Sequence, residues 1–195
     1  MGYVKNKIKE LSKEAGSKKN ARKDAEAWYR SNLRSRELKE AVSTRDRFEP
    51  GKIYVFYFSP ITGDLPWFDR KPVVLALERV DDNDLGINLN LLPVRVKEQL
   101  LDDLYNRLEG QIKNQTSGSR YYDANRQGAL RITYTGMKAY LQRSGCDFAI
   151  RQYKPERKRN QAVVSYAKWP EIALCDFISL SGTTIAQIRL MFSSR

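Results

Sequence analysis

Three neighbouring stretches decide the fold, and they are GKIYVFYF (residues 51–58), KPVVLALERV (residues 71–80) and LGINLN (residues 85–90). The first is β-branched and aromatic at successive positions, which is typical of a strand buried on both faces. Pro72 opens the second, one of the few places where a strand accepts proline. The third alternates apolar and polar residues like a half-buried strand. We therefore predict strands at 52–58, 73–80 and 85–90 in an antiparallel sheet or small SH3-like barrel.

On the C-terminal side of these strands, the apolar residues recur with the period of a helix. Val96, Leu100, Leu104 and Leu108 share one helical face, so we predict a helix over 94–108. The polar segment 110–128 contains glycine and serine near its middle and is typical of a loop. Beyond it we predict a short strand and then a helix within 130–141, a basic turn at 154–160, strands at 162–167 and 172–177, and a short amphipathic helix over 183–192.

The N-terminal segment has a different composition. Residues 1–47 contain no proline and are rich in helix formers, and Ser17 can cap a helix that begins at Lys18. Only a thin stripe of this helix is apolar, so two interpretations stay open: a solvated helix with ion pairs along its surface, or an arm that faces nucleic acid. The stripe comprises Ala25, Trp28, Tyr29, Leu33 and Leu38, and the basic residues around it are Arg22, Lys23, Arg30, Arg34 and Arg36.

Positive charge dominates the composition. Lysine and arginine number 35 against 23 aspartate and glutamate residues, which gives a net charge of +12 over 195 residues. Residues 1–50 carry +6, residues 51–110 carry −3 and residues 111–195 carry +9, so a mildly acidic body lies between two basic segments. Such charge favours a polyanionic partner, either nucleic acid or an anionic membrane. No stretch approaches the ~18 apolar residues of a membrane span, so we expect a soluble protein made in a cytoplasm, with neither anchor nor signal peptide.

The chain contains no histidine. Ser-His-Asp and Cys-His triads and the HExxH zinc site all need an imidazole ring, and none can be built here. The carboxylates of Asp81, Asp82 and Asp84 lie in a predicted turn and those of Asp102 and Asp103 on a helix flank, without EF-hand spacing, and no phosphate-binding glycine loop is present. Cys146 and Cys175 form no CxxC motif and fit reduced thiols. We therefore predict no catalytic residue, no metal and no cofactor.

Basic and aromatic residues are the remaining candidates for function. Phosphate binding needs only positive charge and backbone donors, so clusters of lysine and arginine suffice for sequence-independent binding. Tyr54, Phe56, Tyr57 and Phe58 could stack on bases, but consecutive aromatic residues on a strand cannot all face solvent, which favours core packing. Tyr121 and Tyr122, in a polar loop, are better candidates for exposure. The predicted phosphate contacts are Lys18, Lys19, Arg22, Lys23, Arg30 and Arg34 in the N-terminal helix and Lys154, Arg157, Lys158 and Arg159 in the C-terminal turn.

Motifs also follow one another in a specific order. The run FEPGKIYVFYFSPITGDLPWFDRKPVVLALE (residues 48–78) precedes LGINLNLLP (residues 85–93), LLDDLYNRL (residues 100–108) and LRITYTGMKAYL (residues 130–141). Over about residues 20–180 this series resembles the DNA end protector family of contractile-tailed bacteriophages. The resemblance implies a minor, non-catalytic virion protein that joins the end of the packaged genome or the head-tail junction. Cys175-Asp176-Phe177 departs from the family pattern, which has an aliphatic residue, leucine and proline there.

A second resemblance concerns the same strands. PGKIYVF (residues 50–56) and DRKPVVLAL (residues 69–77) are similar to the barrel of mRNA-interferase toxins. Those nucleases use an arginine just before the second strand, which Arg70 or Lys71 would match, together with a threonine after it. No threonine occurs between Thr62 and Thr116, so this resemblance indicates a shared small-barrel architecture more than a shared activity.

Together these observations predict an α+β protein with a basic helical arm at 1–49 and an α+β core domain at 50–195. The expected function is that of a bacteriophage virion protein that binds the phosphates of the packaged duplex DNA end or lies at the head-tail junction, with other virion proteins, in a symmetric assembly. One alternative is a tail, baseplate or neck assembly protein, in which the apolar stripe of the arm docks on another subunit. The third is an RNase of the toxin type.

Overall fold

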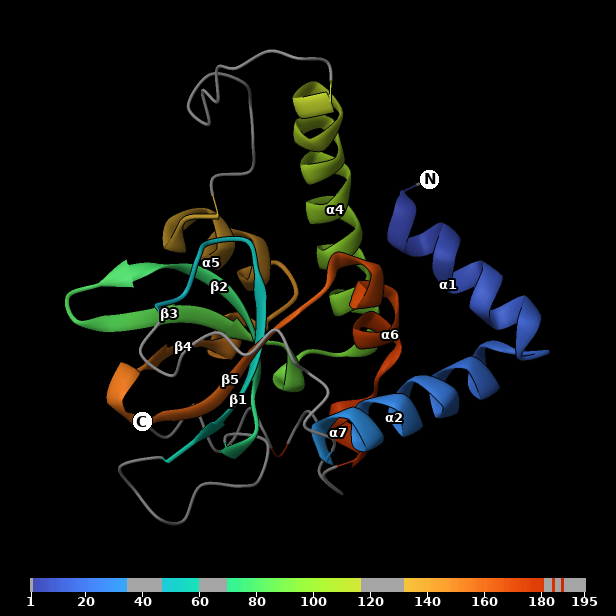
Figure 1. Cartoon of the computed structure of the whole chain (residues 1–195), viewed down its shortest axis with the longest axis horizontal. Helices are drawn as coiled ribbons and strands as arrows, with labels where there is room; N and C mark the ends of the chain where they lie inside the picture. Colours follow the sequence, from blue (N-terminus) through green and yellow to red (C-terminus); the bar gives the residue numbers. More distant parts are fainter. Residues whose placement is uncertain are drawn as a thin grey trace.

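The computed structural model describes residues 2–34, 47–59, 70–116 and 132–180, together with Thr184 and Gln187. One sheet lies beside a group of helices, with α4 and α6 between the sheet and the pair α1 and α2 (Figure 1). The helices are α1 (Tyr3–Glu14), α2 (Lys18–Arg34), α4 (Val94–Thr116), α5 (Tyr134–Gln142), α6 (Trp169–Leu174) and α7 (Phe177–Leu180), and the strands are β1 (Ile53–Phe58), β2 (Val73–Val80), β3 (Asn83–Asn88), β4 (Ile150–Tyr153) and β5 (Lys158–Val164). Short 3-10 helices are η1 (Leu89–Leu91), η2 (Asp147–Ala149), η3 (Pro155–Arg157) and η4 (Tyr166–Lys168).

The sheet has five antiparallel strands in the order β4-β3-β2-β1-β5. Its three central strands are the three predicted from the opening stretches of sequence, and β3 begins two residues earlier than expected. In the register of β1 with β2, Ile53 lies opposite Leu75 and Val55 opposite Val73. Consecutive residues are buried along these strands because both faces of the sheet are covered. The predicted α+β class and antiparallel sheet are confirmed.

The sheet is strongly curled. Tyr153 of β4 packs edge-on against Phe56 and Phe58 of β1, with ring centroids 5.3 and 5.2 Å apart, although β2 and β3 lie between these strands in the sheet. Residues 154–157 are enough to join the two edge strands, β4 and β5. Within the described residues these edges do not pair with each other, so the sheet is open and the SH3-like barrel is not confirmed.

The two faces of the sheet bury different side chains. Aliphatic residues of β1 to β3 face the helices, where Trp169 and Leu174 of α6 and Leu101 of α4 complete a large core. Aromatic residues gather on the other face, and Phe48 stacks on Tyr54 there with ring centroids 4.6 Å apart. Burying apolar area of this extent is the main source of stability for a chain of this size.

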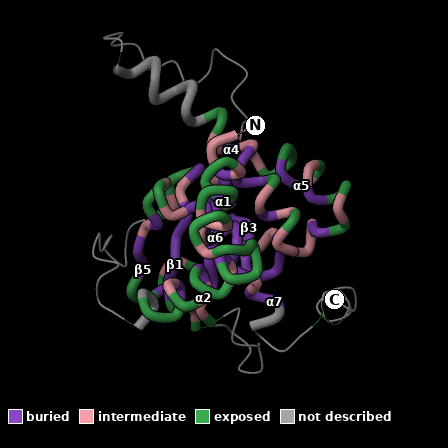
Figure 2. Tube along the Cα trace, turned by 90° about the vertical axis from the view of Figure 1, so that its right-hand side faces the viewer, coloured by how far each residue is buried: buried purple, intermediate pink, exposed green. Residues whose placement is uncertain are grey.

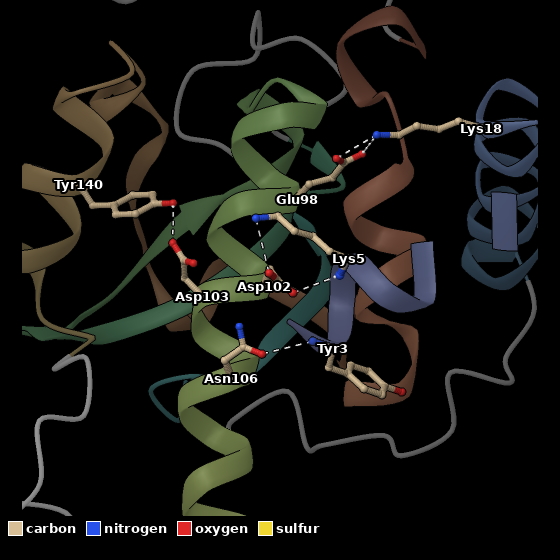
Figure 3. A network of polar contacts seen from close by, with 8 residues as sticks. All are labelled: Tyr3, Lys5, Lys18, Glu98, Asp102, Asp103, Asn106 and Tyr140. Carbon is tan, nitrogen blue, oxygen red and sulfur yellow. Dashed lines mark hydrogen bonds and ion pairs between the residues drawn. The ribbon is translucent and has the colours of Figure 1, made fainter. Parts of the chain in front are cut away.

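Helix α4 ties the N-terminal helices to the rest of the chain through polar side chains (Figure 3). Helix α1 has no capping side chain of its own, and α4 supplies the acceptors instead: Tyr3 N–H donates to Asn106 at 3.2 Å and Lys5 N–H to Asp102 at 3.1 Å. These acceptors satisfy backbone donors that a helix start leaves without intrahelical partners. On its opposite flank, Asp103 of α4 accepts from the Tyr140 hydroxyl of α5 at 3.3 Å.

Helix α2 begins where the sequence predicts. The Asn20 N–H donates to the Ser17 side chain at 3.1 Å, which confirms Ser17 as the cap. The apolar stripe buries Ala21, Ala25 and Tyr29 in the same core as the sheet. Ala25 and Tyr29 of the predicted stripe therefore pack within this chain, whereas the side chains of Leu33 and Leu38 lie outside the described residues, and the assembly alternative stays a prediction. The division into an arm (1–49) and a core domain (50–195) stays a prediction.

The C-terminal half differs most from expectation. The predicted strand at 172–177 is wrong, because residues 169–174 form helix α6, with Pro170 in its first turn, where proline is accepted. The predicted strand at 162–167 lies four residues earlier, as β5, and β4 was not predicted. Helix α4 extends to Thr116 into the predicted loop, and the helix within 130–141 is α5. Most of the predicted helix over 183–192 lies outside the described residues.

Candidate nucleic-acid interface

Five of the six predicted phosphate contacts of the N-terminal helix have described side chains, and they divide into two groups. Lys18 and Arg22 lie beside the buried stripe of α2, and both have carboxylate partners. Lys18 pairs with Glu98 of α4 at 2.7 Å, and Arg22 lies 3.7 Å from Asp176. Carboxylates of the same chain therefore neutralise part of their charge. These two residues fit the first interpretation of this segment, a solvated helix with ion pairs along its surface.

Lys19, Lys23 and Arg30 form the second group. They are spaced by one and then two helical turns, which places them on one face of α2, away from the buried Ala21, Ala25 and Tyr29. All three are exposed and make no ion pair with another described residue. With the helix rise, this row of charges extends about 16 Å, which is about five base-pair steps of duplex DNA. The outer face of α2, defined by these three residues, therefore has the exposed positive charge that the nucleic-acid interpretation requires, and that interpretation stays a prediction. The backbone of Arg34 continues the helix, but its side chain lies outside the described residues.

The predicted basic turn contains η3 and the start of β5. Lys154 and Arg159 are exposed, and the Arg157 guanidinium donates to the backbone carbonyl of Ser59 at 3.3 Å. Glu156 is exposed in the same turn, so the turn combines three surface cations with one carboxylate. The positive side chains outnumber the negative one here, as phosphate binding requires.

Lys158 is the exception among the predicted contacts. Its side chain is fully buried, forms an ion pair with the buried carboxylate of Asp84, and has its Nζ 4.0 Å from the centroid of the Phe48 ring. Burial lowers the pKa of Lys158, and the hydrogen bond to Asp84 opposes that shift. The prediction of a phosphate contact at Lys158 is therefore corrected, because successive strand residues point to opposite faces and this one points inward.

A further aromatic and basic cluster lies where β1 ends. Tyr57 is 39% exposed, Lys71 places its Nζ 5.1 Å from the centroid of the Tyr57 ring, and Arg159 is the cross-strand partner of Tyr57. Directly paired residues on adjacent strands project from the same face of a sheet. Lys71 was not among the predicted phosphate contacts, because the sequence marked it only through the resemblance to the toxins and did not show that it lies beside Tyr57 and Arg159.

Helix α2 carries exposed residues along its outward side, whereas β1 is buried along most of its length and becomes exposed only near its end (Figure 2). Burial is the main cause that raises the pKa of Tyr29, and the neighbouring Tyr57 contributes to the same shift. Tyr29 belongs to the buried side of α2, so this proximity does not place the outer face of α2 beside Tyr57.

The other aromatic candidates of β1 are covered wholly or in part. Tyr54 and Phe56 are buried, which confirms the preference for core packing, and Phe58 is partly covered. Tyr121 and Tyr122 lie outside the described residues, as do Arg36 and Leu38.

A buried lysine lies behind the N-terminal half of α2. Lys97 of α4 is fully buried, donates to the Cys175 carbonyl at 2.5 Å and has its Nζ 4.2 Å from the centroid of the Phe177 ring. Burial lowers its pKa from 10.5 to about 8, although the neighbouring Cys175 and Asp176 act in the opposite direction. Nothing in the helical pattern of residues 94–108 distinguishes this position, so sequence reasoning missed it.

Replacing Lys97 by methionine is expected to change how stability depends on pH. Below about pH 8 the lysine is charged in both states, and its burial costs the native state about 3 kcal/mol relative to a neutral group. Between about pH 8 and 10.5 the unfolded chain binds a proton that the native chain has lost, so the stability of the unsubstituted protein rises relative to Lys97→Met.

Urea unfolding of both proteins at pH 7, 9 and 10 measures this difference. The thiol of Cys175, whose pKa burial raises to about 12, titrates in both proteins and largely cancels from the comparison. A free-energy difference between the two proteins that is the same at all three pH values would show that Lys97 is not buried as described.

The described part of the chain also contains thiols, carboxylates and long helices. Cys146 and Cys175 are free and buried thiols. No group of three histidine, cysteine, aspartate or glutamate side chains there could hold a metal ion. Within the same ranges, no helix has the length and apolar character that crossing a membrane requires.

The fold and this surface define a mixed helix-and-sheet protein whose exposed cations suit a polyanion. The sequence matches a protein family described as "Phage T4 terminal DNA protecting protein" over residues 2–181. The chain belongs to this family, and the resemblance to the DNA end protectors of contractile-tailed phages is confirmed. Neither a curated protein nor a solved structure matches the chain.

Proposed function

We propose that this chain binds the end of the packaged duplex genome in the virion and protects it without catalysis. The observation that carries the proposal is the outer face of α2, where three exposed cations in a row lack carboxylate partners among the described residues. Membership of a family of phage DNA-protecting proteins supports the choice of DNA as the polyanion.

The proposed interface is a basic path of seven residues. It combines two regions, the outer face of α2 and the cluster formed by Tyr57 and the basic turn, and in this proposal one duplex contacts both. Lys18 and Arg22 have a lesser part, because their charges are paired internally. The seven cations of the basic path are Lys19, Lys23, Arg30, Lys71, Lys154, Arg157 and Arg159.

The position of the protein in the particle follows from the same proposal. A protein on the genome end acts after packaging, at the stage of head completion, and lies at the head-tail junction, where symmetric assemblies of other virion proteins surround the DNA. Chemistry on the DNA is not part of the proposal, because phosphate contacts alone hold a duplex without cleaving it.

The salt dependence of binding tests the proposal. Each phosphate contact releases counterions, so the logarithm of the association constant for a linear duplex is expected to fall linearly with the logarithm of salt concentration. The slope should be about −3 if only the three residues of the α2 face bind, and about −6 if the whole basic path binds. Fluorescence anisotropy with a labelled duplex measures it, and a slope near zero, or no binding at low salt, would contradict the proposal.

A further inference from the structure

Tyr57 is one of two large apolar side chains that are exposed in the described part of the chain, and the other is Tyr134. Their exposed fractions are nearly equal, at 39% and 36%. A single exposed tyrosine needs no functional explanation by itself. The surroundings of the two rings differ, however, and that difference points to a ligand for Tyr57.

Cations surround Tyr57. Lys71 lies over its ring, and Arg159 is its partner on β5. Arg157 donates to the carbonyl of Ser59, two residues beyond Tyr57. Within the part of the chain that the structure describes, the charged side chains beside this ring are therefore cations.

Tyr134 also has a lysine beside its ring, but the other charged groups near it are carboxylates. Lys138 places its Nζ 5.3 Å from the centroid of the Tyr134 ring, much as Lys71 does at Tyr57. The Tyr134 N–H, however, donates to the carboxylate of Glu78 at 3.0 Å, and Asp147 is close enough to contribute to the raised pKa of Lys138. Carboxylates beside this ring disfavour a phosphate nearby, so Tyr134 serves as a natural comparison.

A duplex end has a feature that the rest of the duplex lacks. Every internal base pair is covered above and below by its neighbours, whereas the last base pair exposes one flat apolar face beside the terminal phosphates. Aromatic side chains stack on exposed bases with little regard to sequence, and lysine and arginine pair with phosphates. A tyrosine set among cations is complementary to both parts of a duplex end.

We propose that Tyr57 stacks on the terminal base pair of the duplex, while Lys71 and Arg159 contact the phosphates of its two strands. This inference rests on the proposed function and adds the means by which an end is distinguished from internal DNA. The phosphate contacts of the basic path supply general affinity, and the Tyr57 ring supplies the preference for the end.

Two duplexes of identical sequence test the inference, one with open blunt ends and one closed by a hairpin loop at each end. The unsubstituted protein should bind the open duplex about tenfold more tightly, a factor within the range of stacking one base on an aromatic ring. Tyr57→Thr, which suits a strand, and Tyr57→Leu, which keeps apolar bulk, should both lose this preference. Tyr57→Phe should retain the preference, and Tyr134→Ala should not change it.

Each outcome separates the two proposals. If the unsubstituted protein prefers open ends and both Tyr57→Thr and Tyr57→Leu keep that preference, the inference about Tyr57 is wrong and the proposed DNA binding stands. Equal binding of both duplexes by the unsubstituted protein would also overturn the inference. Absence of binding to either duplex would overturn the proposed function itself.

Discussion

Asp84→Ala is expected to lower the free energy of unfolding by about 3–5 kcal/mol, because it leaves the Lys158 ammonium buried without a counter-charge. The side chains of Asp84 and Lys158 are 2% and 0% exposed, so water cannot replace the lost carboxylate. Asp84 also accepts a hydrogen bond from the Phe48 N–H at 3.4 Å, and that contact is lost too. Urea unfolding of both proteins measures the loss in the free energy of unfolding. The dependence of that free energy on urea concentration should have the same slope in both proteins.

Two further variants test whether the unpaired charge of Lys158 causes the loss of stability in Asp84→Ala. Asp84→Leu combined with Lys158→Met removes both charges and should cost less than Asp84→Ala alone, because no unpaired ion remains in the core. Asp82, two residues away, forms an exposed ion pair with Arg79, and Asp82→Ala should change stability by less than about 1 kcal/mol. If Asp84→Ala cost no more than Asp82→Ala, the buried ion pair would not have the stabilising role described here.

Charge reversal on the outer face of α2 is expected to have the largest effect on DNA binding. The triple variant Lys19→Glu, Lys23→Glu and Arg30→Glu removes three phosphate contacts and places three negative charges against the duplex. Affinity for a linear duplex at low salt should fall by about a hundredfold or more, and the salt slope should become shallower by about 3. Anisotropy titrations at several salt concentrations measure both quantities.

The matched control reverses three exposed cations outside the basic path. Lys9 and Lys13 on α1 and Arg107 on α4 are exposed, and their change to glutamate alters the net charge by the same amount. This control should lose only a few-fold in affinity, through the general field of the protein. An equal loss in both triple variants would mean that overall charge, and not the α2 face, governs binding.

The central strands could be predicted because their signal is local. Runs such as Ile53–Phe58 and Val73–Val80 have the β-branched and aromatic composition of strands, and short connections leave few other pairings. Helix α6 could not be predicted in this way. Its residues Ile172, Ala173 and Leu174 are all buried, so no helical period appears, and a short apolar run fits a strand equally well.

The sequence predicted most cations of the candidate site, but not which of their side chains are exposed and which are buried. The four cations of the basic turn are alike in sequence, and only the pairing of β5 with β1 shows that Lys158 points inward and Arg159 outward. The ion-pair partner of Lys158 is Asp84, 74 residues away, and the residues next to Lys158 in the sequence do not indicate this pairing. On α2 the helical period does separate Lys19, Lys23 and Arg30 from Lys18 and Arg22, once the buried stripe is known.

Protection of a linear duplex against a processive exonuclease tests the central claim most directly. The unsubstituted protein should slow digestion from an open end, with an effect that weakens as salt is raised. The triple variant of the α2 face should leave the duplex unprotected while it unfolds at the same urea concentration as the unsubstituted protein. Equal protection by the two proteins would contradict the claim that the exposed cations of α2 hold the end of the DNA.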